Sequence, residues 1–210
     1  MAHDKTFSLN NLTWDYAFRE YFTGGVLRIH NPSGGFHGLL QQWWDYYAIQ
    51  GVNNVLLISE GNVAKHELEL LYPNWRITTL DLHYEVTNGE PADMIGDICD
   101  YNLISKLNMS PNFDIVINQA LLEHVYNPFE AMKNMISFLK DDGVLITMTC
   151  AQKFIYHAYP SDCFRFMVDW WYNLPTQIIG IQLLELYEDV YESCVFSCYK
   201  KIKSVGITTM

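Results

Sequence analysis

The chain has 210 residues, a length typical of one domain and sufficient to bury a full hydrophobic core. Half of its residues are hydrophobic and 18% are charged, which excludes a disordered chain. Lys and Arg number 13 against 24 Asp and Glu, so the formal net charge is −11 and we expect no nucleic-acid partner. No apolar run approaches the ~20 residues of a membrane span, and no secretory signal is visible. We therefore expect no membrane partner and a cytoplasmic location.

Cysteines and histidines show no spacing typical of a metal site. The five cysteines, at positions 99, 150, 163, 194 and 198, contain no pair separated by two residues. The histidines are scattered at positions 3, 30, 37, 66, 83, 124 and 157. The sequence therefore predicts reduced thiols and no metal.

The first 50 residues are rich in aromatic side chains. Helices are expected over residues 12–22 and 36–50, with a turn signal at residues 31–35. We expect residues 1–51 to form a helical, aromatic segment that covers the cleft of the domain at 52–210, the two together making a single compact domain.

After Gly51, short apolar runs alternate with helical patterns. Strands are expected over residues 55–58, 77–80, 92–95, 113–117 and 144–148. Helices are expected over residues 63–71, 101–107 and 167–174, the last ending before Pro175. A further helix begins at Pro128, with Asn127 as its N-cap, and ends at a turn over residues 141–143.

The order of these elements predicts an α/β fold. Alternating strands and helices indicate a doubly wound, mostly parallel sheet with helices on both faces. The last two strands, over residues 181–190 and 193–199, leave no room for a crossover helix. They are expected to form an antiparallel hairpin at one edge of the sheet.

An open parallel sheet binds ligands at the carboxyl ends of its strands. The loop after the first of these strands reads Ser59-Glu60-Gly61, where Gly61 permits a tight turn. Asp81 lies 20 positions past that glycine, where a carboxylate accepts hydrogen bonds from ribose hydroxyls, or else caps the next loop. Asp97, after the third strand, accepts from an adenine amine or caps the following helix, and both interpretations stay open.

Three segments resemble one family. Residues 113–125 read FDIVINQALLEHV, and with residues 127–129 they resemble the fourth-strand motif of class I S-adenosylmethionine-dependent methyltransferases. Residues 139–146 (LKDDGVLI) resemble the family's helix, turn and fifth strand, and residues 159–166 (YPSDCFRF) resemble a loop of its type-11-like branch. The resemblance covers about residues 52–200. It implies a Rossmann-like fold, S-adenosylmethionine as cofactor and methyl transfer to a small-molecule acceptor.

The chain departs from the family pattern at the cofactor loop. Leu57 stands where the family has an acidic residue in the first strand, and the positions of the family's three loop glycines hold Ser59, Gly61 and Val63, so one glycine of the three is kept. These departures support an alternative hypothesis, a catalytically inactive methyltransferase-like module that serves binding or assembly. The sequence does not fix an oligomeric state.

The remaining candidates lie on the fourth-strand end and the loops that follow. Asn118 and Gln119 are expected to face the cofactor cleft. His124 either lines the pocket near the transferred methyl group or packs against the next helix. The loop over residues 156–162 follows the fifth strand, and we expect it to face the acceptor.

That loop carries the candidate catalytic and substrate-binding groups. His157 is the candidate general base, because a histidine imidazole can take a proton near neutrality. Tyr156, Tyr159 and Asp162 are candidate substrate contacts. Arg165 either binds an acceptor carboxylate or pairs with Asp162, and the ion pair is favoured.

Overall fold

The computed structural model describes residues 27–29, 43–46, 48, 51, 54–82, 91–158, 161–189 and 193–203. Its strands are β1 (Leu27–Ile29), β2 (Asn54–Ile58), β3 (Arg76–Asp81), β4 (Met94–Ile95), β5 (Phe113–Gln119), β6 (Leu139–Cys150), β7 (Ile181–Asp189) and β8 (Cys194–Lys201). Its helices are α3 (Gly61–Leu71), α4 (Leu103–Lys106), α5 (Pro128–Phe138) and α6 (Val168–Gln177).

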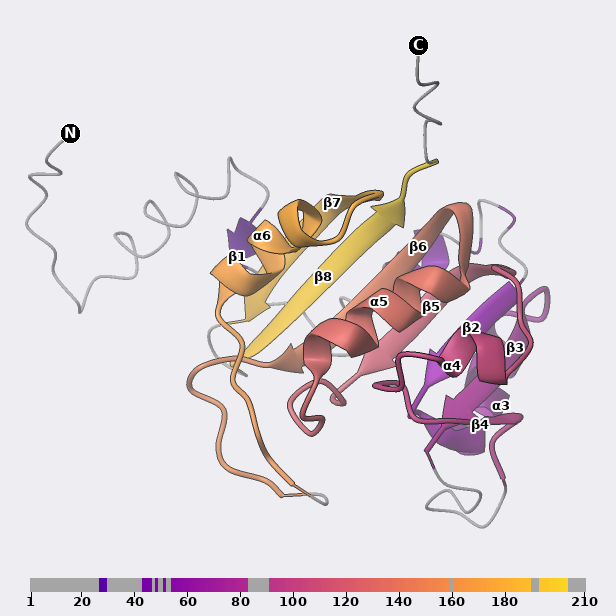
Figure 1. Ribbon diagram of the computed structural model, residues 1–210, viewed down its shortest axis with the longest axis horizontal. Coiled ribbons are helices and arrows are strands. Elements are labelled where there is room, and N and C mark those ends of the chain that lie inside the picture. Colours follow the sequence, from indigo (N-terminus) through magenta and orange to yellow (C-terminus); the bar gives the residue numbers. More distant parts are fainter. Residues whose placement is uncertain are drawn as a thin grey trace, which may run out of the picture.

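The strands form one sheet in the order β1-β7-β8-β6-β5-β2-β3-β4 (Figure 1). All neighbouring pairs are parallel except the two that β8 makes with β6 and β7. The expected mostly parallel sheet with a C-terminal antiparallel hairpin is therefore confirmed. The hairpin does not lie at the edge, however, because β1 pairs with the outer side of β7.

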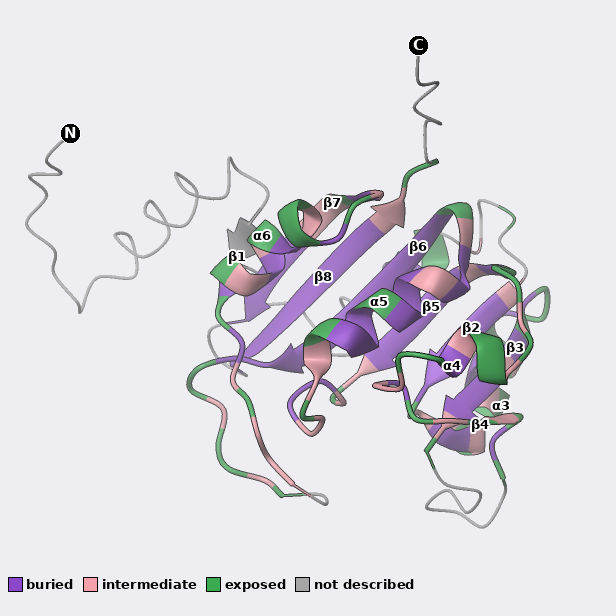
Figure 2. Ribbon diagram, viewed as in Figure 1, coloured by how far each residue is buried: buried purple, intermediate pink, exposed green. Residues whose placement is uncertain are grey.

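Alternating side chains of the central strands supply two hydrophobic cores, one on each face of the sheet. On β2, Leu56 and Ile58 pack with the apolar faces of α4, α5 and α6, whereas Val55 and Leu57 pack on the opposite face with Leu68 of α3. Figure 1 shows α4, α5 and α6 on the near face, and Figure 2 shows the buried strands between them and α3. Leu57 is fully buried, so the position where the family that the sequence resembles carries an acidic residue belongs to the core here.

Helix α5 begins as expected. The Asn127 side chain accepts a hydrogen bond from the Glu130 N–H at 3.2 Å, and Pro128 occupies the first turn. The expected turn over residues 141–143 is wrong as a boundary, because β6 already starts at Leu139 and pairs with Phe113. Residues 140–143 form an irregularity within the strand, where Asp142 adopts a φ of 67°. The other strands and helices expected after residue 51 are present, although β4 and α4 are shorter than expected and α6 ends later.

Helix α6 passes through Pro175, contrary to the expectation that it ends before that residue. A proline has no N–H, so the Trp171 carbonyl four residues earlier loses its helical partner. The buried Tyr199 hydroxyl of β8 donates to that carbonyl at 2.5 Å. A hydrogen bond from the neighbouring strand therefore replaces the helical one, and the helix continues to Gln177.

The N-terminal segment is described only in part. Residues 43–46 and 48 are helical, within the expected helix over residues 36–50, and Trp43 and Trp44 are buried in the core on the α3 face. The expected helix over residues 12–22 lies outside the described residues, as does most of the segment 1–51. No helix in the described ranges is both long enough and apolar enough to cross a bilayer.

Candidate functional site

The loop between β2 and α3 turns sharply at two residues. Ser59 and Gly61 have φ angles of 64° and 68°, and the Ser59 N–H donates to the Leu80 carbonyl on β3. Serine rarely adopts this conformation, so the turn is a strained one of the kind that functional sites hold.

Glu60 lies between these two residues with a carboxylate that is poorly solvated. Burial raises its pKa from 4.5 to about 8, while hydrogen bonds from the Gln119 backbone and side chain act in the opposite direction. Its buried Oε1 atom has no hydrogen-bond partner within the described part of the chain. A buried carboxylate oxygen without a partner is suited to a cationic ligand.

A pocket opens beside this loop, at the carboxyl ends of β2, β3 and β4. It brings together three of the predicted cofactor residues, Ser59, Asp81 and Asp97. The rest of its lining is apolar apart from one glycine: Ile58, Leu80, Leu82, Gly96, Ile98, Leu121 and Val125. The other four predicted cofactor residues are not part of this lining: Glu60, Gly61, Asn118 and Gln119.

Asp97 also caps the turn that precedes α4. Its Oδ1 atom accepts from the Cys99 N–H at 2.8 Å. A carboxylate has about four acceptor positions, so this bond leaves acceptor capacity toward the pocket. Both interpretations of Asp97 are thus compatible with its position.

Asn118 and Gln119 end strand β5 beside that loop. The fully buried Asn118 side chain donates from Nδ2 to the Ile58 carbonyl at 3.2 Å and ties β5 to β2. Gln119 contacts Glu60 through its hydrogen bonds. Asn118 thus fixes the two strands, and Gln119 positions the Glu60 carboxylate.

The loops after β5 and β6 are bound to one another by their main chains. The Glu123 carbonyl accepts from the N–H groups of Cys163 and Phe164, at 2.7 and 3.1 Å. The His124 Nδ1 atom hydrogen-bonds to the Ser161 carbonyl, and the His124 ring lies edge-on to that of His157, with ring centroids 4.9 Å apart. His124 therefore connects the two loops.

The loop after β6 is held in shape by Asp162 and Arg165. The Arg165 guanidinium forms a two-pronged ion pair with Asp162 and also donates to the carbonyls of Phe154, Ile155 and Phe164. Asp162 in turn accepts from the His157 N–H at 2.7 Å. The Arg165 guanidinium holds the pKa of the Asp162 carboxyl well below its usual range. The favoured interpretation of Arg165, an internal ion pair, agrees with these contacts.

The other two substrate candidates differ in how far they are described. The Tyr156 side chain is exposed to solvent on the same loop. Tyr159 lies outside the described residues.

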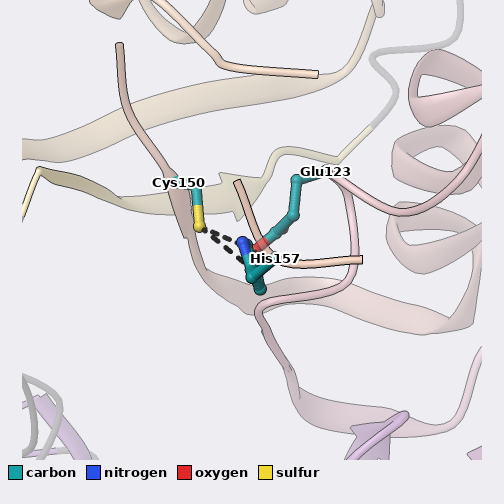
Figure 3. A group of neighbouring side chains, drawn as sticks. All are labelled: Glu123, Cys150 and His157. Carbon is teal, nitrogen blue, oxygen red and sulfur yellow. Dashed lines mark hydrogen bonds and ion pairs between the residues drawn. The ribbon is translucent and has the colours of Figure 1, made fainter. Parts of the chain in front are cut away.

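The structure also brings together three residues that sequence reasoning did not combine, Glu123, Cys150 and His157 (Figure 3). Their side chains point toward one another from the loop after β5, the end of β6 and the loop after β6. The Cys150 thiol donates to Glu123 Oε1 at 3.0 Å, and the Thr149 hydroxyl donates to Oε2. Burial raises the pKa of the Cys150 thiol, and Glu123 acts in the same direction. Cys150 ends the parallel strand β6, and Glu123 and His157 follow the ends of β5 and β6, which is the signal that could have grouped them.

This arrangement defines an α/β protein with a Rossmann-like sheet and a ligand pocket at the carboxyl ends of its parallel strands. No protein-family model matches the sequence, and no curated protein matches it. Solved structures do match the fold. A SAM-dependent methyltransferase from Archaeoglobus fulgidus has a TM-score of 0.54 at 14% identity, covering 90% of this chain and 100% of that one.

Two further structures illustrate the range of this fold. The N-methyltransferase NodS of Bradyrhizobium japonicum has a TM-score of 0.53 at 16% identity, over 80% of this chain and 97% of NodS. The [4+2]-cyclase SpnF has a TM-score of 0.56 at 12% identity, over 89% of this chain and 92% of SpnF. The chain thus shares the Rossmann-like fold of these class I S-adenosylmethionine-dependent methyltransferase structures. The type-11-like branch stays a prediction.

Proposed function

We propose that this chain transfers a methyl group from S-adenosylmethionine to a small-molecule acceptor. The proposal is carried by the pocket at the carboxyl ends of β2, β3 and β4, where Ser59, Asp81 and Asp97 meet among apolar side chains. NodS, which shares the fold, is known with S-adenosyl-L-homocysteine bound. Methyltransferases among the similar structures support the reaction class.

The residues of the pocket suit an adenosine group. Asp81 would accept hydrogen bonds from the ribose hydroxyls, and Asp97 one from the exocyclic amine of adenine. Leu82, Ile98 and Leu121, which also line the pocket, would contact the apolar faces of the base. The groups present therefore fit the nucleoside end of the cofactor.

Glu60 suits the cationic end. Its partnerless, buried Oε1 atom would gain an electrostatic partner from an ammonium or sulfonium group. When bound, S-adenosylmethionine supplies an electrophilic methyl group on a sulfonium. Gln119 keeps the Glu60 carboxylate in position through its hydrogen bonds.

The acceptor would bind beside the joined loops after β5 and β6. His157 would take the proton of a hydroxyl acceptor, and His124 would hold the His157 ring in place through their edge-on contact. Tyr156 is exposed for contact with the acceptor, whereas Asp162 and Arg165 act by keeping the loop folded. An uncharged amine would need no such base.

Calorimetry with S-adenosylmethionine tests the proposal at its first step. Binding that is weakened in Asp81→Ala and unchanged in Glu67→Ala, which replaces an exposed carboxylate on α3, would support the assigned pocket. Methyl transfer to a panel of hydroxyl, amine and thiol compounds would then identify the acceptor class. A folded chain without binding heat would refute the proposal and favour the inactive binding module.

A further inference from the structure

Glu123, Cys150 and His157, here called the Glu123 cluster, form a group outside the cofactor pocket. Three donor atoms of different types face one another: the carboxylate Oε1, the thiol Sγ and the imidazole Nε2. Sγ lies 3.0 Å from Oε1 and 3.9 Å from Nε2, and Nε2 lies 3.9 Å from Oε1. Three ligand-type atoms of this kind on three separate chain segments suggest more than a hydrogen-bond network.

The spacing of these atoms matches the size of a metal ion. A point equidistant from the corners of this triangle lies about 2.1 Å from each, and zinc bonds to S, N and O are about 2.3, 2.0–2.1 and 2.0–2.2 Å long. We propose that the Glu123 cluster is a binding site for a divalent transition-metal cation of the zinc type. The cation would replace the thiol proton, which passes to the buffer.

The donor set favours zinc over magnesium or calcium. Thiolate and imidazole ligands select zinc, whereas magnesium and calcium take oxygen ligands. One carboxylate and one thiolate together carry two negative charges, which a divalent cation neutralises. A neutral His157 completes the set without adding charge.

Hydrogen bonds outside the cluster orient the ligands. Thr149 donates to Glu123 Oε2, whereas Cys150 and His157 lie next to the other carboxylate oxygen, Oε1. His157 Nδ1 lies 3.3 Å from the Ile155 carbonyl and 3.5 Å from Asp162 Oδ2. A proton on Nδ1 would face these two oxygens and leave the Nε2 lone pair directed at Sγ and Oε1. Metal-bound histidines commonly have this second hydrogen bond.

The cluster would leave one coordination position open. Glu123 and Cys150 are buried, with 0% and 2% of their surface exposed, but the His157 side chain is 34% exposed. Three protein ligands with a fourth position for water or substrate are typical of catalytic rather than structural zinc. Because a bound cation would occupy Nε2, His157 could not then act as the general base, so the two roles are alternatives at one nitrogen.

Metal counting on the full chain, without a histidine tag, tests this proposal. The protein is stripped with a chelator, equilibrated with Zn²⁺, desalted and analysed for zinc. We expect one zinc per chain in the wild type and in Cys163→Ser, a control substitution in the neighbouring loop. Cys150→Ser should bind zinc about 100-fold more weakly or worse, since even loss of an outer hydrogen bond costs about 10–100-fold.

Cobalt provides a second readout that requires no activity. Co²⁺ bound to the wild type should give a thiolate-to-cobalt charge-transfer band that is lost in Cys150→Ser and kept in Cys163→Ser. His157→Gln, which leaves the buried Glu123 untouched, should also lose the bound metal. Absence of zinc from the wild type, or equal zinc in Cys150→Ser, would overturn the proposal. Neither result depends on S-adenosylmethionine, so the methyltransferase proposal is tested separately.

Discussion

Glu60→Gln should change how the stability of this protein depends on pH. The folded state holds the Glu60 pKa at about 8, above its ordinary 4.5, mainly through burial. Deprotonation is therefore about 5 kcal/mol less favourable in the folded than in the unfolded chain, at ~1.4 kcal/mol per pH unit. A group with a raised pKa contributes its stability fully below about pH 4.5, and that contribution is lost as the pH rises toward 8.

The experiment compares how much the free energy of unfolding changes between pH 5 and pH 7 in the wild type and in Glu60→Gln. Between pH 5 and pH 7, the free energy of unfolding of the wild type should fall by about 2–3 kcal/mol relative to that of Glu60→Gln, because only the wild type releases this proton on unfolding. Glutamine keeps the carbonyl that accepts from Gln119 and cannot ionise. Urea unfolding at both pH values, without cofactor, gives the four free energies needed.

Glu67→Gln is the matched control, since that side chain is exposed on α3. Its stability should follow that of the wild type at both pH values. If the difference between wild type and Glu60→Gln changes by less than about 0.5 kcal/mol between pH 5 and pH 7, Glu60 is not a carboxyl that burial keeps protonated.

Four further outcomes are expected. Affinity for S-adenosylmethionine should rise about tenfold from pH 6 to pH 7 if the cation pairs with ionised Glu60, and a titration of Glu60→Gln by calorimetry should show no such rise. Asp81→Ala should weaken cofactor binding by roughly 1.5–3 kcal/mol, and an unchanged dissociation constant in a folded variant would assign the ribose to another residue. With a hydroxyl acceptor, His157→Ala should slow methyl transfer by roughly 10²–10⁴-fold at unchanged cofactor affinity; full activity with every acceptor would remove His157 from the site. Tyr199→Phe should lower the free energy of unfolding by about 1–3 kcal/mol, since it leaves the Trp171 carbonyl buried without its partner, and denaturant melts that match the wild type would contradict this role.

The fold was predictable where hydrophobic periodicity decides it. Apolar runs such as Val55–Ile58 and the capped start of α5 gave the parallel sheet and its helices, because both faces of the sheet must be covered. The end of α6 was not predictable, since the partner that allows Pro175 within the helix is Tyr199, on another element. Local propensity carries no information about such a distant hydrogen bond.

The candidate site also has one part that was predictable from the sequence and one part that was not. Ser59, Asp81 and Asp97 follow three strands, and parallel strand ends gather at one edge of a sheet, so their meeting in one pocket was predictable. Glu123, Cys150 and His157 were not grouped, because rules of ligand spacing apply to short motifs within one segment. Here the three residues come from the end of β6 and from the two loops that follow β5 and β6.

The placement of β1 has a consequence for how the chain is made. Leu27 pairs with Leu186, so β1 is synthesised long before the strand with which it pairs. Closing so long a loop is entropically unfavourable and slow, and until then the outer edge of β7 has exposed backbone donors and acceptors. Such an edge can template pairing with another chain. A chain that lacks β1 should therefore be more prone to self-association than one that contains it, although its strands from β7 to β4 would keep the same order.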